Sequence, residues 1–149
     1  MIERTVARQL FFGILLCIAA TMSAVADGIL DANTASTEEL TGLAELNETL
    51  VETILVNRPY ETIGALNELL SQSLDADTLE SLYGKLFVPL KLNSASDSDI
   101  QLIPGVGRKM AHEFEEYRPY TSMEQFRREI GKYVDEQEVA RLEQYVTLE

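Results

Sequence analysis

Residues 93–120 read NSASDSDIQLIPGVGRKMAHEFEEYRPY, and this stretch determines the fold that we predict. The same pattern stands 60 residues earlier, where residues 33–60 read NTASTEELTGLAELNETLVETILVNRPY. Both copies begin with an N-x-A-S segment and end with R-P-Y, and they align without a gap. Self-similarity at a fixed offset indicates that the chain contains a duplicated structural unit.

The apolar positions repeat at the same offset as the identical residues. The matching pairs are Leu40/Ile100, Leu43/Ile103, Leu50/Met110, Ile54/Phe114, Leu66/Phe126, Leu70/Ile130, Leu79/Val139 and Leu86/Val146. Many of these positions are three or four residues apart, which places them on one face of a helix. Neither copy shows sustained strand alternation. We therefore predict an all-α fold, in which the last two pairs belong to a fourth helix of each copy.

The local start and stop signals predict four short helices in each copy. Ser36-Thr37-Glu38-Glu39 is a capping box that begins the first helix. The second helix should end before Pro59 in one copy and before Pro119 in the other, because the residue before a proline avoids the helical region. Thr62 and Ser122 are the expected N-caps of the third helices.

The repeat divides the chain into three segments. Residues 1–26 precede it, residues 27–90 contain the first copy, and residues 91–149 contain the second. We expect two separately packed four-helix units, joined near residues 89–92, because each copy has its own complete set of apolar positions.

The first 26 residues have the features of a secretory signal peptide. Arg4 and Arg8 supply positive charge, and an uncharged, mostly apolar run follows over residues 10–20. Ala24-Val25-Ala26 then provides small residues at the cleavage position, so the mature chain should begin at Asp27. This predicts a periplasmic or secreted protein without a membrane span after cleavage. The alternative is an uncleaved anchor formed by residues 10–26.

Composition excludes several classes of function. The 149 residues include 25 acidic and 12 basic side chains, for a net charge of −13, with one Cys and one His. No disulfide framework, Cys/His zinc site or recognisable catalytic set can be assembled from these residues. We expect no enzyme activity, no metal and no cofactor. The acid excess also argues against a generally basic nucleic-acid surface.

The turn Ile103-Pro104-Gly105-Val106-Gly107 resembles the h-P-G-h-G turn of helix-hairpin-helix proteins. Together with the flanking N-x-A-S and R-P-Y segments, it resembles the ComEA-type competence proteins, which are exported DNA receptors. The resemblance covers most of residues 92–148 and, more weakly, residues 32–88. It implies two tandem four-helix (HhH)2 units. A related fold without DNA binding exists in an extrinsic subunit of photosystem II, so the fold alone does not decide the function.

The resemblance implies a DNA-phosphate site at Gly105, Val106, Gly107, Arg108 and Lys109. Glycines allow close backbone approach, and unpaired N–H groups at the following helix start can donate to a phosphate oxygen. Such contacts bind double-stranded DNA without reading its sequence. Alternatively, the glycines merely permit a tight link between two helices. The nearby Arg127, Arg128 and Lys132 either join this site or form a solvated helix end.

The first copy departs from this pattern. Its equivalent residues are Ala44-Glu45-Leu46-Asn47-Glu48-Thr49, which place two carboxylates where a phosphate would dock. Residues 27–90 contain two basic and twelve acidic residues, whereas residues 91–149 contain eight and twelve. We therefore expect weak, sequence-independent DNA binding by the second copy. The alternative is a periplasmic protein–protein interaction module that docks on a larger complex without binding DNA.

Overall fold

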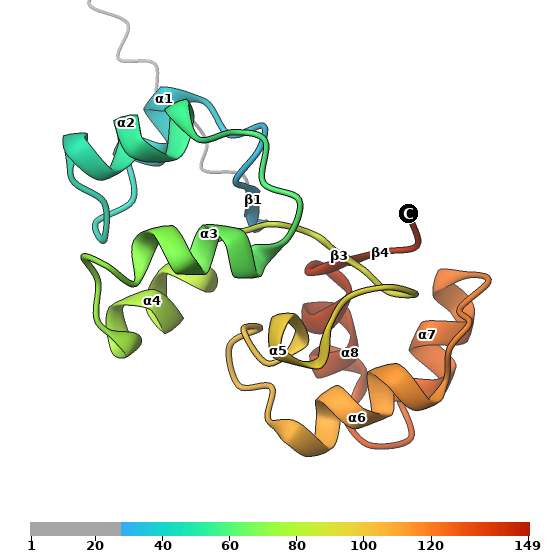
Figure 1. The fold of residues 1–149 in the computed structure, drawn as a ribbon. Helices are drawn as coiled ribbons and strands as arrows, with labels where there is room; N and C mark the ends of the chain where they lie inside the picture. The colour runs from blue at the N-terminus through green and yellow to red at the C-terminus, as the bar shows by residue number, and fades with distance from the viewer. Residues whose placement is uncertain (1–27) are drawn as a thin grey trace, which may run out of the picture.

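The computed structural model describes residues 28–149, so the predicted signal peptide and its cleavage site lie outside the described residues. This part is mostly helical, with eight helices in two similar groups of four (Figure 1). The first group contains α1 (Thr37–Thr41), α2 (Glu48–Val56), α3 (Ile63–Leu70) and α4 (Ala76–Tyr83). The second contains α5 (Asp97–Ile100), α6 (Arg108–Glu116), α7 (Met123–Ile130) and α8 (Glu136–Glu143).

Within each group, two strands of two residues pair the start of the group with its end. The all-α prediction missed these four strands. They are β1 (Leu30–Asp31), β2 (Leu86–Phe87), β3 (Leu90–Lys91) and β4 (Val146–Thr147). β1 pairs in parallel with β2, and β3 with β4, so each group begins and ends on one short ladder. Leu86 and Val146 therefore lie in strands and not in the fourth helices, which end at Tyr83 and Glu143. A two-residue strand is too short to show a period-two pattern.

The predicted helix boundaries are confirmed at the capping residues. The Ser36 side chain accepts from the backbone N–H of Glu39, and the Glu39 carboxylate accepts in return from Ser36. The Thr62 and Ser122 side chains cap α3 and α7. Both α2 and α6 end before the arginine that precedes the proline. Local sequence chemistry thus sets where these helices begin and end.

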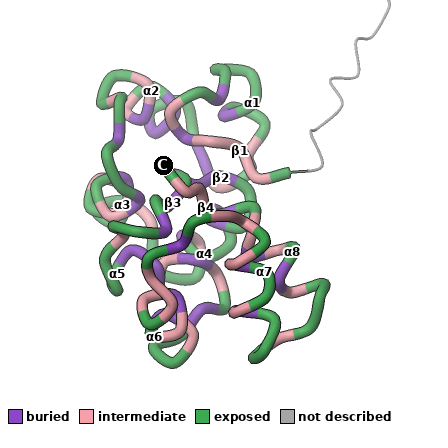
Figure 2. Tube along the Cα trace, turned by 90° about the vertical axis from the view of Figure 1, so that its right-hand side faces the viewer, coloured by how far each residue is buried: buried purple, intermediate pink, exposed green. Residues whose placement is uncertain are grey.

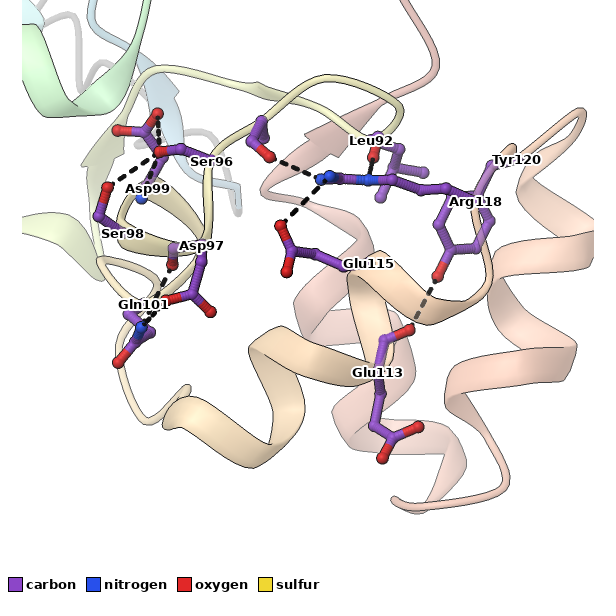
Figure 3. Close-up of polar contacts among 11 residues, drawn as sticks. Leu92, Ser96, Asp97, Ser98, Asp99, Gln101, Glu113, Glu115, Arg118 and Tyr120 are labelled. Carbon is purple, nitrogen blue, oxygen red and sulfur yellow. Dashed lines mark hydrogen bonds and ion pairs between the residues drawn. The ribbon is translucent and has the colours of Figure 1, made fainter.

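The identical segments of the repeat contact each other and hold each group together. The Arg118 guanidinium donates to the backbone carbonyls of Leu92, at 2.6 Å, and Ala95, at 2.7 Å. Figure 3 shows the contact between Arg118 and Leu92. The Asn93 side chain pairs with both backbone groups of Tyr120, at 2.9 and 2.7 Å. The first copy repeats these contacts with Arg58 on Ala32 and Ala35, and with Asn33 on Tyr60. The N-x-A-S and R-P-Y identities therefore have a structural cause.

The two groups keep their own helices, but they do not pack separately as expected. Their buried side chains form one continuous cluster, and purple buried segments occur in both groups in Figure 2. The Phe87 and Tyr145 rings meet edge to face, with centroids 4.8 Å apart. The backbone N–H of Gly64 donates to the Asp99 carboxylate at 2.9 Å. Residues 88–92 join the groups without a flexible linker, because Val88, Leu90 and Leu92 are buried and residues 90–91 form β3.

Candidate nucleic-acid interface

The turn between α5 and α6 exposes its two glycines and buries the residue between them. Gly105 has φ +78°, in the left-handed region that favours glycine. The Val106 side chain is buried, and its backbone N–H donates to the Ile103 carbonyl at 2.9 Å. Val106 thus anchors the turn through its side chain and its N–H, and its predicted contact with a phosphate stays a prediction.

Gly107 has no steric reason to be glycine. Its φ is −97°, and a Cβ added there would meet nothing within 4 Å. In the first group the equivalent residue is Asn47, whose side chain accepts from the backbone N–H of Leu50 at 2.9 Å. The absence of a side chain at Gly107 leaves the start of α6 accessible to a ligand.

Among the eight helices in residues 28–149, α6 alone begins without a side-chain hydrogen bond from its N-cap residue. The first turn of an α-helix has no intrahelical partners for its N–H groups, and here those groups belong to Arg108, Lys109 and Met110. The helix dipole also favours an anion at this end. The start of α6 is thus an uncapped donor site.

The two cations at this helix start are exposed and unpaired. Within the described residues, neither Arg108 nor Lys109 lies within ion-pair distance of a carboxylate. An anion that approaches the α6 N–H groups therefore meets two positive charges that no carboxylate of this part of the chain neutralises.

The predicted basic cluster at the end of α7 is neutralised by carboxylates instead of joining this site. Arg127 pairs with Glu143 and Glu124, and both Arg128 and Lys132 pair with Glu129. Hydrogen bonds from Lys132, the larger effect, and from Arg128 hold the pKa of Glu129 below its ordinary value, so this carboxylate stays charged. The cluster is therefore a set of surface ion pairs.

Arg141 of α8 is a cation near the turn that the sequence analysis missed. One of its guanidinium nitrogens lies 3.8 Å from where a Cβ of Gly105 would stand. Glu138 accepts two hydrogen bonds from it, at 2.7 and 2.6 Å, and its guanidinium lies over the Tyr145 ring. Nothing in the spacing of the sequence placed residue 141 beside residue 105, because this contact depends on how α8 packs.

The equivalent turn of the first group is occupied by its own carboxylate. The Glu45 Oε1 atom accepts from Ser81 Oγ at 2.7 Å and from Lys85 Nζ at 2.5 Å. Burial opposes ionisation of Glu45, but the hydrogen bonds from Lys85 and Ser81 outweigh it and keep the pKa of this carboxyl below its ordinary value. Glu48 adds a second negative charge at the start of α2. This turn therefore repels anions.

A cleft of about 440 Å³ separates the glycine turn from the first group. Residues 101–107 line one side of this cleft, while Asn67, Glu80 and Tyr83 of α3 and α4 line the other. The Glu80 carboxylate faces the same space as the turn, which limits how far a polyanion can enter from that side. Access to the start of α6 is better from the side of Arg108 and Lys109.

Comparison with protein-family models, with curated protein sequences and with solved structures finds no match to this chain. Within residues 28–149, no helix is both long enough and apolar enough to cross a membrane.

Proposed function

We propose that this protein binds the phosphate backbone of double-stranded DNA through the α5–α6 turn of its second group, as an exported helix-hairpin-helix protein of the ComEA type. Gly105 and Gly107 give a phosphate access, the N–H groups of the first turn of α6 donate to it, and Arg108 and Lys109 add charge. In this proposal each group is an (HhH)2 unit, and a signal peptide cleaved after Ala26 directs the chain out of the cytoplasm.

The observation that carries this proposal is the uncapped start of α6. In the seven other helices of residues 28–149, the N-cap side chain accepts a hydrogen bond from a backbone N–H of the first turn. At α6 the side chain is missing although the space for one exists. An unsatisfied helix start beside two free cations is a ready site for an anion.

The proposed binding is weak and independent of sequence. Contacts from backbone N–H groups and two cations reach phosphates and carry no base code. Binding that releases counterions from about two phosphates should have a log–log salt slope of roughly −2, with dissociation constants of about 10⁻⁴–10⁻⁶ M. The acidic first group would repel DNA and orient it toward the second.

The test is a fluorescence-anisotropy titration of a labelled duplex at several salt concentrations. The double variant Arg108→Glu with Lys109→Glu should abolish binding, because it places two carboxylates at the start of α6. The matched control is Glu45→Ala with Glu48→Ala in the first group, which should leave binding unchanged or slightly tighter. Binding that survives the first double variant would locate the DNA site elsewhere.

A second candidate function is docking on a protein complex, which the asymmetry of charge favours. In residues 28–90 the two cations are Arg58, which binds backbone carbonyls, and Lys85, which pairs with Glu45. The remaining surface charge of that group is negative. If the wild-type protein fails to bind duplex DNA at low salt, this docking function replaces the first proposal.

A further inference from the structure

The first group has a surface groove of about 370 Å³ between the end of α2 and the outer side of α3. Asn57, Pro59 and Tyr60 line it from the connecting segment, and Ala65 and Leu69 line it from α3. Tyr60 is buried, while Asn57, Pro59 and Ala65 are exposed. The buried Tyr60 therefore forms the base of the groove, and its sides are open to solvent.

The second group shows what this fold places in the equivalent position. There the side chain of Gln125 donates to the carbonyls of Tyr117 and Pro119, at 3.3 and 3.2 Å. Its oxygen accepts from the backbone N–H of Thr121 at 2.9 Å. The second copy therefore fills this position with a hydrogen-bonding side chain of its own.

The first copy has Ala65 where the second has Gln125, so these hydrogen bonds are not made. Among the described residues, no protein group bonds to the carbonyls of Asn57 and Pro59 or to the N–H of Glu61. The groove consequently presents two backbone acceptors close together. A side chain with several N–H donors would satisfy both.

The groove of the first group is more acidic than the equivalent position of the second. Glu61 and Glu68 line the groove of the first group, whereas the second group has Thr121 and Arg128 at the same offset. Neither Glu61 nor Glu68 forms an ion pair within residues 28–149. The groove therefore favours a cationic occupant, and its carbonyls and carboxylates all act as acceptors.

We propose that this groove binds an arginine side chain carried on a basic segment of a partner protein. A guanidinium has five N–H donors in a planar fork and no acceptor, which matches a site made of carbonyls and carboxylates. The same fold already uses this chemistry, because Arg58 and Arg118 each bind two backbone carbonyls with one guanidinium. Pro59 and Leu69 provide apolar walls for the methylene stem.

The residue that precedes the groove along the chain is apolar and exposed, which suits a protein partner. Val56, the residue before Asn57, is 76% exposed and has the largest exposed fraction among the bulky apolar residues of 28–149. The inference does not depend on DNA binding, because the groove belongs to the first group and the glycine turn to the second.

The test follows amide chemical shifts of the ¹⁵N-labelled full chain during titration with N-acetyl-arginine amide. We expect saturable shifts at Asn57, Glu61 and Ala65, and weaker effects from N-acetyl-glutamine amide, which lacks the charge. Equal affinity for the two probes, or no saturable shift with the arginine probe, would overturn the proposal.

Two variants introduce residues of the second copy into the groove and test whether the groove itself binds the arginine probe. Ala65→Gln fills the groove with the side chain that the second copy uses, and it should eliminate the saturable shifts. Glu68→Arg reverses one rim charge and should weaken binding by roughly twofold to fivefold, the scale of an exposed ion pair. The spectra of both variants report whether they fold. Folded variants that bind the arginine probe as wild type does would refute the site.

Discussion

At the scale of single residues, the arginine of each R-P-Y segment joins the start of its group to the middle. Arg118 reaches two carbonyls between β3 and α5 from a position after α6, and it is partly buried. Replacing Arg118 by Ala leaves those carbonyls without their donor. We expect the free energy of unfolding to fall by about 1.5–3 kcal/mol, the range for hydrogen bonds to charged groups. Urea denaturation measures this, with Arg128→Ala as the exposed control.

The control should change stability by less than about 0.5 kcal/mol, because Arg128 makes a surface ion pair. Arg118→Lys should recover little of the lost stability, since an ammonium group cannot span two carbonyls as a planar fork does. Equal effects of Arg118→Ala and Arg128→Ala would contradict the structural role given to the R-P-Y segments.

Glu45 makes stability depend on pH in a predictable direction. Its pKa is lowered in the folded state from an ordinary value of 4.5. The folded protein therefore binds fewer protons at this site than the unfolded chain, and the contribution of Glu45 to stability is present above pH 4.5. That contribution is lost as the pH falls through the lowered value. Glu45→Gln should flatten the acid side of the stability curve, measured by urea denaturation between neutral and acidic pH. An unchanged acid limb would contradict this assignment.

At the scale of elements, a change of the N-cap residue of α6 should affect stability and DNA binding in opposite directions. Gly107→Asn introduces the cap that α2 already has in Asn47, into a position with room for it. We expect the variant to be more stable than wild type by a few tenths of a kcal/mol, because Asn is a slightly better N-cap than Gly. It should also bind DNA more weakly, since its side chain competes for the N–H groups of α6. Thermal unfolding and anisotropy together give the comparison.

Gly107→Ala provides the matched control, because it adds a methyl group in the same space without an acceptor. DNA binding by this variant should exceed that of Gly107→Asn. Unchanged binding by Gly107→Asn would show that the helix start does not contact phosphate.

At the scale of the whole molecule, the continuous packing predicts one cooperative unfolding transition. Phe87 and Tyr145 join the groups through their rings, and Gly64 joins them through Asp99. A Cβ at Gly64 would lie 2.5 Å from the Asp99 oxygen, so Gly64→Ala must displace that carboxylate. We expect a single calorimetric transition whose midpoint falls in Gly64→Ala and stays nearly constant in Glu68→Ala. Two resolved transitions in wild type would mean that the groups unfold independently.

The sequence predicted the features that depend on neighbours along the chain. The helices, the caps Ser36, Thr62 and Ser122, and the two similar groups all follow from local spacing and from the repeat. The missed features depend on contacts between distant segments. The strand pairs are two residues long and join the ends of each group, and Arg141 reaches Gly105 only because α8 packs there. The bridge from Asp99 to Gly64 has no counterpart in the repeat and so left no periodic signal.

The measurement that tests the central claim most directly maps a short DNA duplex onto the protein by amide chemical shifts. Titration of the ¹⁵N-labelled protein at low salt should shift the amide signals of Gly107, Arg108, Lys109 and Met110, with smaller changes at Gly105. The amides of Asn47, Glu48, Thr49 and Leu50, at the equivalent helix start, should not move. Shifts at both helix starts, or at neither, would contradict the account.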